Sequence, residues 1–558
     1  MTKKEKLFYY IIYYRIPQLI LSALILCFLH VPLFTGFCHL TRLTDQHILY
    51  TISKYVFNIG LLLLYVLSTA FFLRNKIYHQ LTNRHYIYDH HTFQKPFLEL
   101  VRFYSNSNPY RIRPQDLPMK DWHTADGVIL CKYKDKIGKY HLLAKPSSAP
   151  GNLLSLGLPG CGKTSTQAAT TSIRFSGGIF AISIKGDLLN FVKGKRKNIK
   201  VFTPDKEEGS CHYNPLNDLM NMNWTERRKF VENISINICP DEPGENAAFF
   251  VGGSRDFLSG IILYLLHLHD TDQRPGDLRF HEIVDYILSS NVFDTTLNIQ
   301  NCGNSIPGEY TNGYIGSSEK NCAGIWSHLC KQIRPFNTGA LRTLFDGQGD
   351  CITPDDLGYS DVYLDVPQDK YQIYSNALRI ITSQFLESFM RRPDVSSGET
   401  TVPILFLLDE AALLKLDFDL LSNSLASLRS KKVSLFLLCQ SLHQLSSIYG
   451  EKQAHQVMDL CQYISVFNAQ DPSSRSYFQQ LIGKEKVLKV NTSLSAPTNA
   501  EDNKSLTKTI SVSESEEYIF NSSDFGNLDT TKHGKKIKQV LVYANGKYIL
   551  GETTPCYE

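Results

Sequence analysis

The sequence has little net charge for its length. Its 58 Lys and Arg residues against 54 Asp and Glu residues give only +4 over 558 residues, so any basic residues that meet nucleic acid would have to act locally. The 13 cysteines contain no C-x-x-C pair and no Cys/His spacing typical of a zinc site, which fits reduced thiols in a cytosol. No arrangement of Ser, His and Asp indicates a nucleophile, and no internal repeat is visible.

The first 75 residues differ in kind from the rest. Two apolar runs cover residues 16–38 and 55–73, and each is close to the ~20 residues needed to cross a bilayer as a helix. Basic residues flank the pair and are few between the runs, so both ends are expected in the cytoplasm. Because a second span follows and no cleavage site is evident, the anchor is expected to be retained. The sequence predicts a two-helix transmembrane anchor at 1–75 and a juxtamembrane linker at 76–126. A buried hairpin in a soluble protein is the less favoured alternative.

From residue 127 the chain alternates short apolar runs with helical periodicity, the pattern of an α/β protein with buried parallel strands. The expected strands are 127–131, 152–156, 178–184, 199–202, 362–366, 404–408 and 433–438, and two more at 540–543 and 548–550 close the fold. A polar segment at 491–515 is expected to be an exposed loop or a hairpin.

Strand-like runs are missing between residue 217 and about residue 335, where the apolar spacing is helical. We therefore predict a nucleotide-binding domain made of 127–216 and 335–558, interrupted by an inserted all-α domain at 217–334. The length and the 43% apolar content are enough for two or three domains.

A glycine-rich phosphate-binding motif follows the expected strand at 152–156. Residues 157–164, GLPGCGKT, satisfy G-x-x-x-x-G-K-[ST], and a helix-compatible run begins at Ser165. In such a loop the backbone N–H groups wrap a β-phosphate, Lys163 supplies positive charge to the β and γ oxygens, and the Thr164 hydroxyl is placed to ligate Mg²⁺. The expected cofactors are ATP and Mg²⁺. The predicted nucleotide-contacting residues are Gly157, Pro159, Gly160, Cys161, Gly162, Lys163, Thr164 and Ser165.

Two acids, Asp409 and Glu410, end the apolar run 404–408. Ligands bind at the carboxyl edge of open α/β sheets, so both acids are expected beside the P-loop. Asp409 is predicted to hold Mg²⁺ together with Thr164, and Glu410 to act as the general base toward the attacking water. For either acid alone, an acidic turn after a buried strand is a reasonable alternative.

Two more polar residues are candidates. Arg429 lies twenty residues after Asp409, at the end of a helical run and before the strand at 433–438. There it could reach the γ-phosphate of a neighbouring subunit as an arginine finger, or be an ordinary solvated arginine. Gln440 ends the same strand and could sense the γ-phosphate or water, or be a surface glutamine.

These motifs resemble those of the coupling-protein ATPases of type IV secretion and conjugation, the TraD/TraG kind. The most specific pieces are Leu408 to Ala412, Leu425 to Arg429 and Leu438 to Leu445, closed by Tyr449-Gly450. Lys185-Gly186-Asp187 and Tyr213 to Leu216 are similar to the family's K-G-[ED] and N-P-L segments, although Ser183-Ile184 stands where the family usually has Asp-Pro.

The resemblance implies a RecA-like motor with an inserted all-α domain, assembled as a homo-hexamer on the cytoplasmic face of a bacterial inner membrane. It also implies that Arg429 acts in trans and that Gln440 senses nucleotide. The implied partners are DNA, a relaxase–DNA complex and components of the type IV secretion channel.

Direct contact with DNA is the weakest expectation. The cluster Lys193, Lys195, Arg196, Lys197 and Lys200 could meet phosphates at a central channel, with a solvated basic loop as the favoured alternative. The same ambiguity applies to Lys532, Lys535, Lys536 and Lys538.

The sequence therefore favours an ATP-hydrolysing coupling protein that transfers relaxase-bound DNA or a protein substrate. One alternative is an FtsK-type motor on duplex DNA, which should carry a winged-helix reader; none follows Tyr548. The other is a membrane receptor that binds nucleotide without hydrolysing it, against which Lys163, Thr164, Asp409 and Glu410 speak.

Overall fold

The computed structural model describes residues 55, 126–134, 140–184, 186–242, 244–396, 401–495, 507–532, 535–544 and 546–553. The expected spans at 16–38 and 55–73 and the linker at 76–126 lie outside the described residues, apart from residues 55 and 126. The described chain falls into two units.

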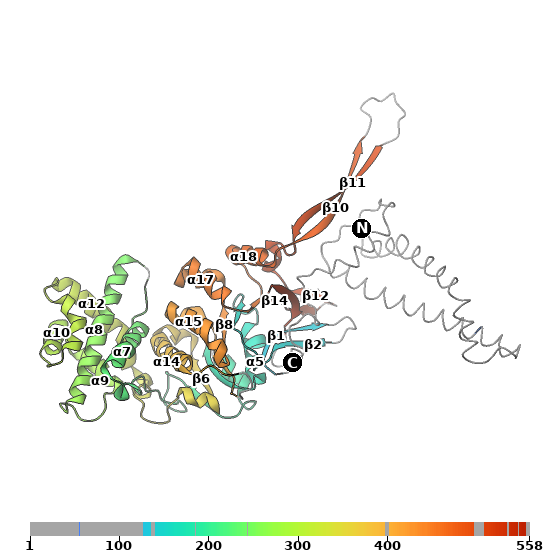
Figure 1. Cartoon of the computed structure of the whole chain (residues 1–558). Coiled ribbons are helices and arrows are strands. Elements are labelled where there is room, and N and C mark those ends of the chain that lie inside the picture. Colours follow the sequence, from blue (N-terminus) through green and yellow to red (C-terminus); the bar gives the residue numbers. More distant parts are fainter. Residues whose placement is uncertain are drawn as a thin grey trace. The chain divides into compact units, whose positions relative to one another are not determined.

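One unit contains a two-stranded sheet made of β10 (Lys484–Ser495) and β11 (Thr507–Tyr518). Residues 491–495 and 507–515 of the polar segment, for which the sequence allowed a loop or a hairpin, lie in these paired strands (Figure 1). Both strands contain Thr and Val, whose high β-propensity favours a strand over an irregular loop.

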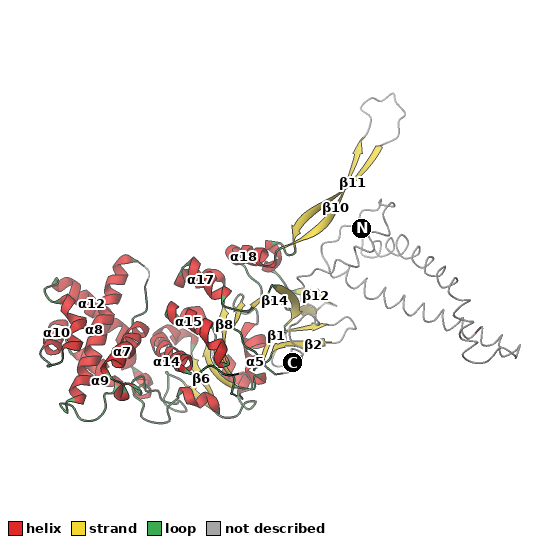
Figure 2. Ribbon diagram, in the orientation of Figure 1, coloured by secondary structure: helices red, strands yellow, loops and turns green. Residues whose placement is uncertain are grey.

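The other unit is built on an eleven-stranded mixed sheet (Figure 2). In order across the sheet, the strands are β2 (Tyr140–Lys145), β1 (Val128–Lys134), β15 (Lys547–Glu552), β14 (Gln539–Ala544), β9 (Tyr463–Val466), β3 (Leu153–Leu156), β8 (Val433–Cys439), β7 (Ile404–Leu408), β4 (Gly178–Ile184), β6 (Asp361–Val366) and β5 (Ile199–Phe202). The strands from β9 to β5 pair in parallel, and the other four pair antiparallel. A separate short pair is formed by β12 (Thr530–Lys532) and β13 (Lys535–Ile537).

The prediction that residues 127–131 form a parallel strand is wrong. The strand exists, as β1, but it pairs antiparallel with β2 and with β15. Its residues Val128 to Cys131 are almost fully buried, and α5 (Ala169–Arg174) packs against the strand. A strand that is buried on both faces has a continuous apolar run in either direction, so this run does not distinguish the two pairings.

Side chains alternate between the two faces of the parallel strands and build a core on each. In β4, Phe180 and Ile182 contribute to the core that also includes α14 (Tyr371–Arg391). Ile179 and Ala181 contribute to the opposite core, with α5 and α6 (Asp187–Val192). The first core also takes side chains from α15 (Phe418–Ser427), α16 (Leu442–Tyr449), α17 (Glu451–Asp459) and α18 (Pro472–Ile482).

Helices, and no strand of the sheet, occupy the described chain between β5 and β6. They are α7 (Trp224–Ile238), α8 (Glu245–Asp270), α9 (Phe280–Ser289), α10 (Val292–Gln300), α11 (Ser305–Thr311), α12 (Glu319–Ile333) and α13 (Gly339–Leu344). The long helix α8 packs against α7, α11 and α12. Among the described helices, the stretch Asn246–Asp270 of α8 is the one that is long and apolar enough to cross a membrane, but 67% of its apolar window is buried within the protein, as in a core helix.

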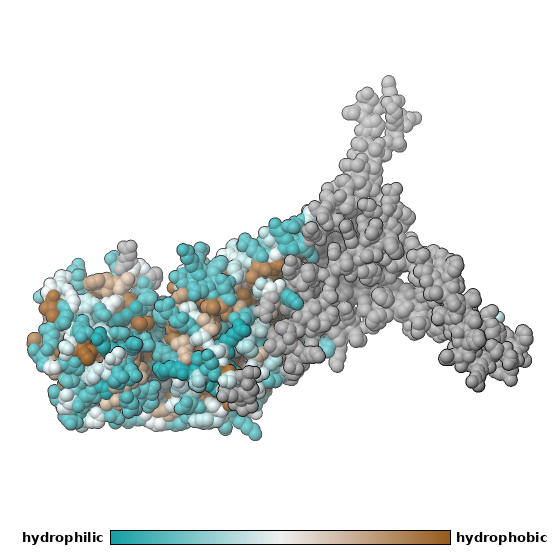
Figure 3. Space-filling view, viewed as in Figure 1, coloured by the Kyte–Doolittle hydropathy of each residue, from teal (hydrophilic) through white to brown (hydrophobic). Residues whose placement is uncertain are grey.

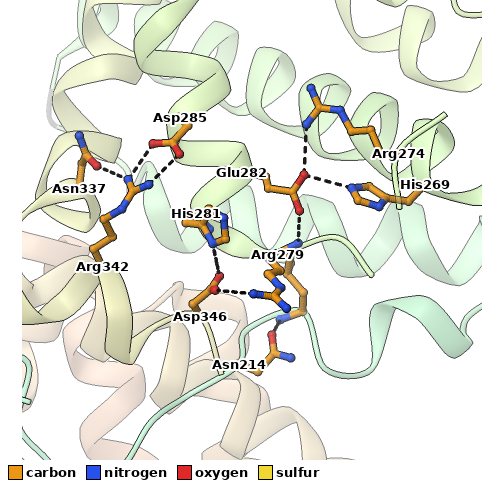
Figure 4. Close-up of polar contacts among 11 residues, drawn as sticks. Asn214, His269, Arg274, Arg279, His281, Glu282, Asp285, Asn337, Arg342 and Asp346 are labelled. Atoms are coloured by element: carbon orange, nitrogen blue, oxygen red, sulfur yellow. Dashed lines mark hydrogen bonds and ion pairs between the residues drawn. The ribbon is translucent and has the colours of Figure 1, made fainter. Parts of the chain in front are cut away.

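Polar side chains fix α9 against its neighbours (Figure 4). Glu282 accepts hydrogen bonds from His269 Nε2 at 3.2 Å and from Arg274 Nη1 at 3.1 Å. Asp285, one turn further on, pairs with Arg342 of α13 at 2.7 Å. These contacts join α8, α9 and α13.

The surface of the helices and the sheet domain in the view of Figure 3 is mostly hydrophilic, with small and separate hydrophobic areas.

A buried arginine connects the helices to the sheet. Arg379 of α14 is 2% exposed, and it donates to the carbonyl oxygens of Leu414 at 2.8 Å and of Asn237 at 2.6 Å. Leu414 follows the acids Asp409 and Glu410 in the chain, and Asn237 lies in the last turn of α7. Burial lowers the pKa of Arg379 to about 10, which still leaves the guanidinium charged at neutral pH.

An Arg379→Met substitution is expected to lower the free energy of unfolding by about 2–4 kcal/mol, because two buried carbonyl groups lose their donor. Chemical denaturation of the full chain measures the loss. Arg391→Met, on an exposed position of the same helix, is the matched control and should change stability by less than about 0.5 kcal/mol. Equal stability of the two variants would show that Arg379 does not hold this junction.

Candidate nucleotide-binding site

The P-loop joins β3 to a π-helical turn, Lys163–Ala168, that continues into α5. Gly162 has φ +106°, in the left-handed region that favours glycine. A Cβ on Gly157 would lie 2.6 Å from the Cβ of Phe467, so a side chain does not fit there. The two glycines therefore let the loop turn sharply and lie against the chain that leaves β9.

Lys163 and Thr164 start the turn and face the interior of the site. Lys163 is 5% exposed, and its ammonium donates to the carbonyl of Gly157 and, at 3.4 Å, to that of Leu158. Thr164 Oγ1 donates to Asp409 Oδ2 at 3.3 Å. The residues that the sequence predicts for a metal site, Thr164 and Asp409, are thus neighbours although 245 positions separate them.

The sheet order brings the second set of residues to the same edge. β8 lies between β3, which precedes the P-loop, and β7, which precedes the acids. Because the three strands are parallel, their carboxyl ends meet, and Leu156 of β3 lies opposite Cys439 of β8. Gln440 follows Cys439 and is therefore placed between the P-loop and the acids.

Glu410 is held in an unusual conformation. Its φ of +51° lies in the left-handed region, which costs a non-glycine residue about 1–3 kcal/mol. Its Oε1 accepts from Gln440 Nε2 at 3.1 Å, and Gln440 N in turn donates to Gln444 Oε1 at 2.9 Å. Its Oε2 is buried without a hydrogen-bond partner among the described residues. One carboxylate oxygen is thus held by Gln440, and the other has no partner in the described chain.

Asp409 is 7% exposed, and its pKa is raised to about 6. The main cause is burial, and the second is the like charge of Glu410; Lys163 and the Thr164 hydroxyl oppose the rise. A buried carboxylate of this kind is stabilised by a bound cation. The oxygens of Thr164 and Asp409 are the ligand type that Mg²⁺ prefers, so these residues fit the metal that the sequence predicts.

Without metal, Asp409→Asn is expected to stabilise the protein at pH 8 by about 3 kcal/mol, the value of a shift of about two pKa units. The folded-state pKa of about 6 lies above the unfolded value of about 3.9, so the wild type loses stability as the pH rises from about 4 to about 7. The gain from Asn should therefore shrink to about 0.5 kcal/mol at pH 4. Chemical denaturation of both proteins in a chelating buffer across this pH range measures the difference in their free energies of unfolding. Asp459→Asn, on an exposed position of α17, serves as the control, and a gain independent of pH would contradict the assignment.

Arg429 is not at this edge. It is exposed and lies in a 3₁₀ turn, Leu428–Lys431, just before β8 begins. Burial raises the pKa of Tyr463, the first residue of β9, and the nearby charge of Arg429 opposes that rise. Tyr463 pairs with Leu153 at the amino end of β3, whereas the P-loop follows the carboxyl end, roughly 10 Å away. The structure therefore does not bring Arg429 to the P-loop of its own chain.

The basic cluster after α6 is partly used by the fold itself. Arg196 forms an ion pair with the buried Asp361 and donates to Gly177 O at 2.7 Å. Lys200 pairs with Asp350 and Asp356. In the described chain, ion pairs of this kind do not involve Lys193, Lys195 or Lys197. Lys185, from the K-G-D segment, lies outside the described residues.

One residue beside the P-loop was not predicted as part of the site. Lys538, which precedes β14, donates from Nζ to Gly160 O at 3.2 Å. The sequence analysis named it only as a member of a basic cluster, and no local motif marks it.

A P-loop after one parallel strand, two acids after another and a polar amide on the strand between them define a P-loop nucleotide-binding α/β protein. A model of the family described as "Type IV secretory system Conjugative DNA transfer" matches residues 132–550. The chain belongs to this family.

Individual relatives agree with the family. The chain is 20% identical over 332 residues to a "probable conjugal transfer protein TraG" of Sinorhizobium fredii (strain NBRC 101917 / NGR234); the match covers 58% of this chain and spans about half of that relative's length, 51%. The fold is similar to unbound TrwBΔN70, a bacterial conjugative coupling protein (TM-score 0.55, 15% identity, 73% of this chain and 85% of that one). It is also similar to the plasmid coupling protein TrwB in complex with the ATP analogue ADPNP (0.55, 14%, 74% and 87%) and with ADP and Mg²⁺ (0.53, 15%, 74% and 87%). The α/β, RecA-like fold that the resemblance implied is therefore confirmed, and its sheet is mixed where the sequence predicted parallel strands.

Proposed function

We propose that this protein is the coupling ATPase of a type IV secretion or conjugation system, which hydrolyses ATP to drive the transfer of a relaxase–DNA complex or a protein substrate. The observation that carries this proposal is the arrangement of Thr164, Asp409, Glu410 and Gln440 at the carboxyl edge of adjacent strands beside the P-loop. Family membership and the nucleotide-bound TrwB relatives support ATP as the substrate and Mg²⁺ as the metal.

Each residue has a separate part in the proposed hydrolysis. Lys163 would exchange its contacts with the P-loop carbonyls for the β and γ oxygens, and Thr164 and Asp409 would hold the metal. Mg²⁺, when bound, supplies positive charge that offsets the charge developing on the phosphates. Glu410 accepts a proton from the attacking water, and the phosphoanhydride bond to the γ-phosphate breaks to give ADP and phosphate. Gln440 holds the other oxygen of Glu410.

The proposed trans role of Arg429 rests on its position. Because it is exposed at the amino edge of the sheet, away from its own P-loop, any contact that it makes with a γ-phosphate would be with that of another subunit. Head-to-tail contacts of this kind form a ring when the rotation between subunits closes, which is compatible with the proposed homo-hexamer. We further propose the division into a nucleotide-binding domain at 127–216 and 335–558 and an all-α domain at 217–334.

The proposed location is the bacterial inner membrane, with the spans at 16–38 and 55–73 as anchor and the ATPase in the cytoplasm. The apolar runs and their basic flanks support this location.

Lys193, Lys195 and Lys197 are the members of their basic cluster that we propose for contact with DNA.

The test is phosphate release by the full chain in detergent micelles, with no DNA, with single-stranded DNA and with duplex DNA. We expect DNA-stimulated hydrolysis that rises steeply with protein concentration and is lost in Lys163→Ala. Absence of turnover under all three conditions, with ADP still bound, would favour the non-hydrolysing receptor. Stimulation by duplex DNA alone would favour the FtsK-type motor.

A further inference from the structure

The strand β14 runs against the direction of the parallel strands. It pairs antiparallel with β9, and Leu541 lies opposite Val466, the last residue of β9. β9 in turn is parallel to β3, so the beginning of β14 lies at the carboxyl edge, where the P-loop is. The residue just before β14 is Lys538, and its carbonyl accepts from Thr553 N at 3.0 Å, which ties its backbone to the end of β15.

The side chain of Lys538 reaches the P-loop itself. Its Nζ donates to Gly160 O at 3.2 Å and lies 3.8 Å from the position that a Cβ on Gly162 would take. Residues 160–162 form the turn whose backbone N–H groups wrap phosphate in a P-loop. Lys538 is exposed, and in the described chain no carboxylate forms an ion pair with it. Its charge is therefore directed at the loop and is not neutralised there.

The other cation of the loop is arranged differently. Lys163 is buried and already donates to two carbonyl oxygens of the loop, those of Gly157 and Leu158. Lys538 makes a single bond and remains open to solvent, so a phosphate that enters the loop meets its ammonium without displacing a buried contact.

We propose that Lys538 is a second phosphate-binding lysine of the nucleotide site, contributed by the far end of the chain, and that it binds the phosphates of a nucleoside di- or triphosphate. This inference rests on the proposed nucleotide binding. If Lys538 binds the phosphates, the start of β14 contacts the ligand directly. Nucleotide binding to the P-loop then also involves the strands β14 and β15.

The first test uses the unaltered full chain in detergent micelles. Lysine side chains are acetylated briefly with an amine-specific reagent, with and without ADP and Mg²⁺, and the modified positions are quantified by mass spectrometry. Lys538 is expected to be protected by ADP, whereas Lys331, on an exposed position of α12, is expected to react equally in both samples. Unchanged labelling of Lys538 in protein saturated with ADP would overturn the inference.

The second test measures ADP affinity by calorimetry for the wild type, Lys538→Gln, Lys538→Arg and the control Lys331→Gln. Loss of one charge-assisted phosphate contact should weaken ADP about tenfold and flatten the salt dependence, while Arg should restore most of the affinity. Equal affinity of Lys538→Gln and wild type would overturn the inference and leave the proposed function intact. Failure of the wild type itself to bind ADP would overturn both.

Discussion

A Glu410→Gln protein is expected to bind ATP as tightly as the wild type but to hydrolyse it about 10²–10⁴ times more slowly, the usual contribution of a general base. The amide of Gln has the same shape as the carboxylate, so it can keep the contact with Gln440, but it cannot take a proton from water. Single-turnover hydrolysis and calorimetric titration with ATP separate the two effects.

The matched control is Glu319→Gln, at an exposed position in the first turn of α12. It removes the same charge outside the nucleotide-binding motifs. It should hydrolyse ATP like the wild type. If Glu410→Gln keeps a hydrolysis rate within a factor of about three of the wild type, an effect well below that of a general base, the base is another group.

Arg429→Ala is expected to lower turnover by about 10³-fold in the assembled protein, the lower end of the effect of an arginine finger, without changing ATP affinity. The reason is its position at the edge of the sheet opposite its own P-loop. An Arg429→Ala subunit keeps an intact P-loop, and a Lys163→Ala subunit keeps an intact Arg429. Mixed in equal amounts before assembly, the two inactive proteins should recover about a quarter of the wild-type rate if they combine at random in a head-to-tail ring.

Arg391→Ala, an exposed arginine at the end of α14, is the control for loss of charge and should be active by itself. A mixture of the two inactive proteins that is no more active than either one would contradict the trans role of Arg429. Recovery would also show that a site is completed between two subunits, because no single chain in the mixture contains a complete site.

The half of the site that lies on β3, β7 and β8 could be predicted because its residues are local to their strands. GLPGCGKT directly follows Leu153–Leu156, and Asp409 and Glu410 directly follow Ile404–Leu408. Parallel strands place their carboxyl ends at one edge, so the position of each motif in its strand fixes its position in the site. The hydrogen bond between Thr164 and Asp409 follows from this rule.

The other half of the site depends on pairings that local pattern does not encode. The strand β9, Tyr463–Val466, was not among the expected strands, yet it lies beside β3. The antiparallel course of β14 brings Lys538 to Gly160 across 378 positions. Arg379 likewise meets Asn237 and Leu414 only after α7 and α14 have packed together. In each case a long-range partner, rather than the residue's own neighbours in sequence, decides its role.

The proposed function is that ATP hydrolysis by this chain drives the transfer of DNA. The most direct measurement is the frequency of DNA transfer from donor cells in which the gene has been deleted and then supplied as wild type, Glu410→Gln or Glu319→Gln, with equal amounts of each protein in the membrane. We expect the wild type and Glu319→Gln to restore transfer and Glu410→Gln to leave it absent. Transfer restored fully by Glu410→Gln would contradict the proposed function.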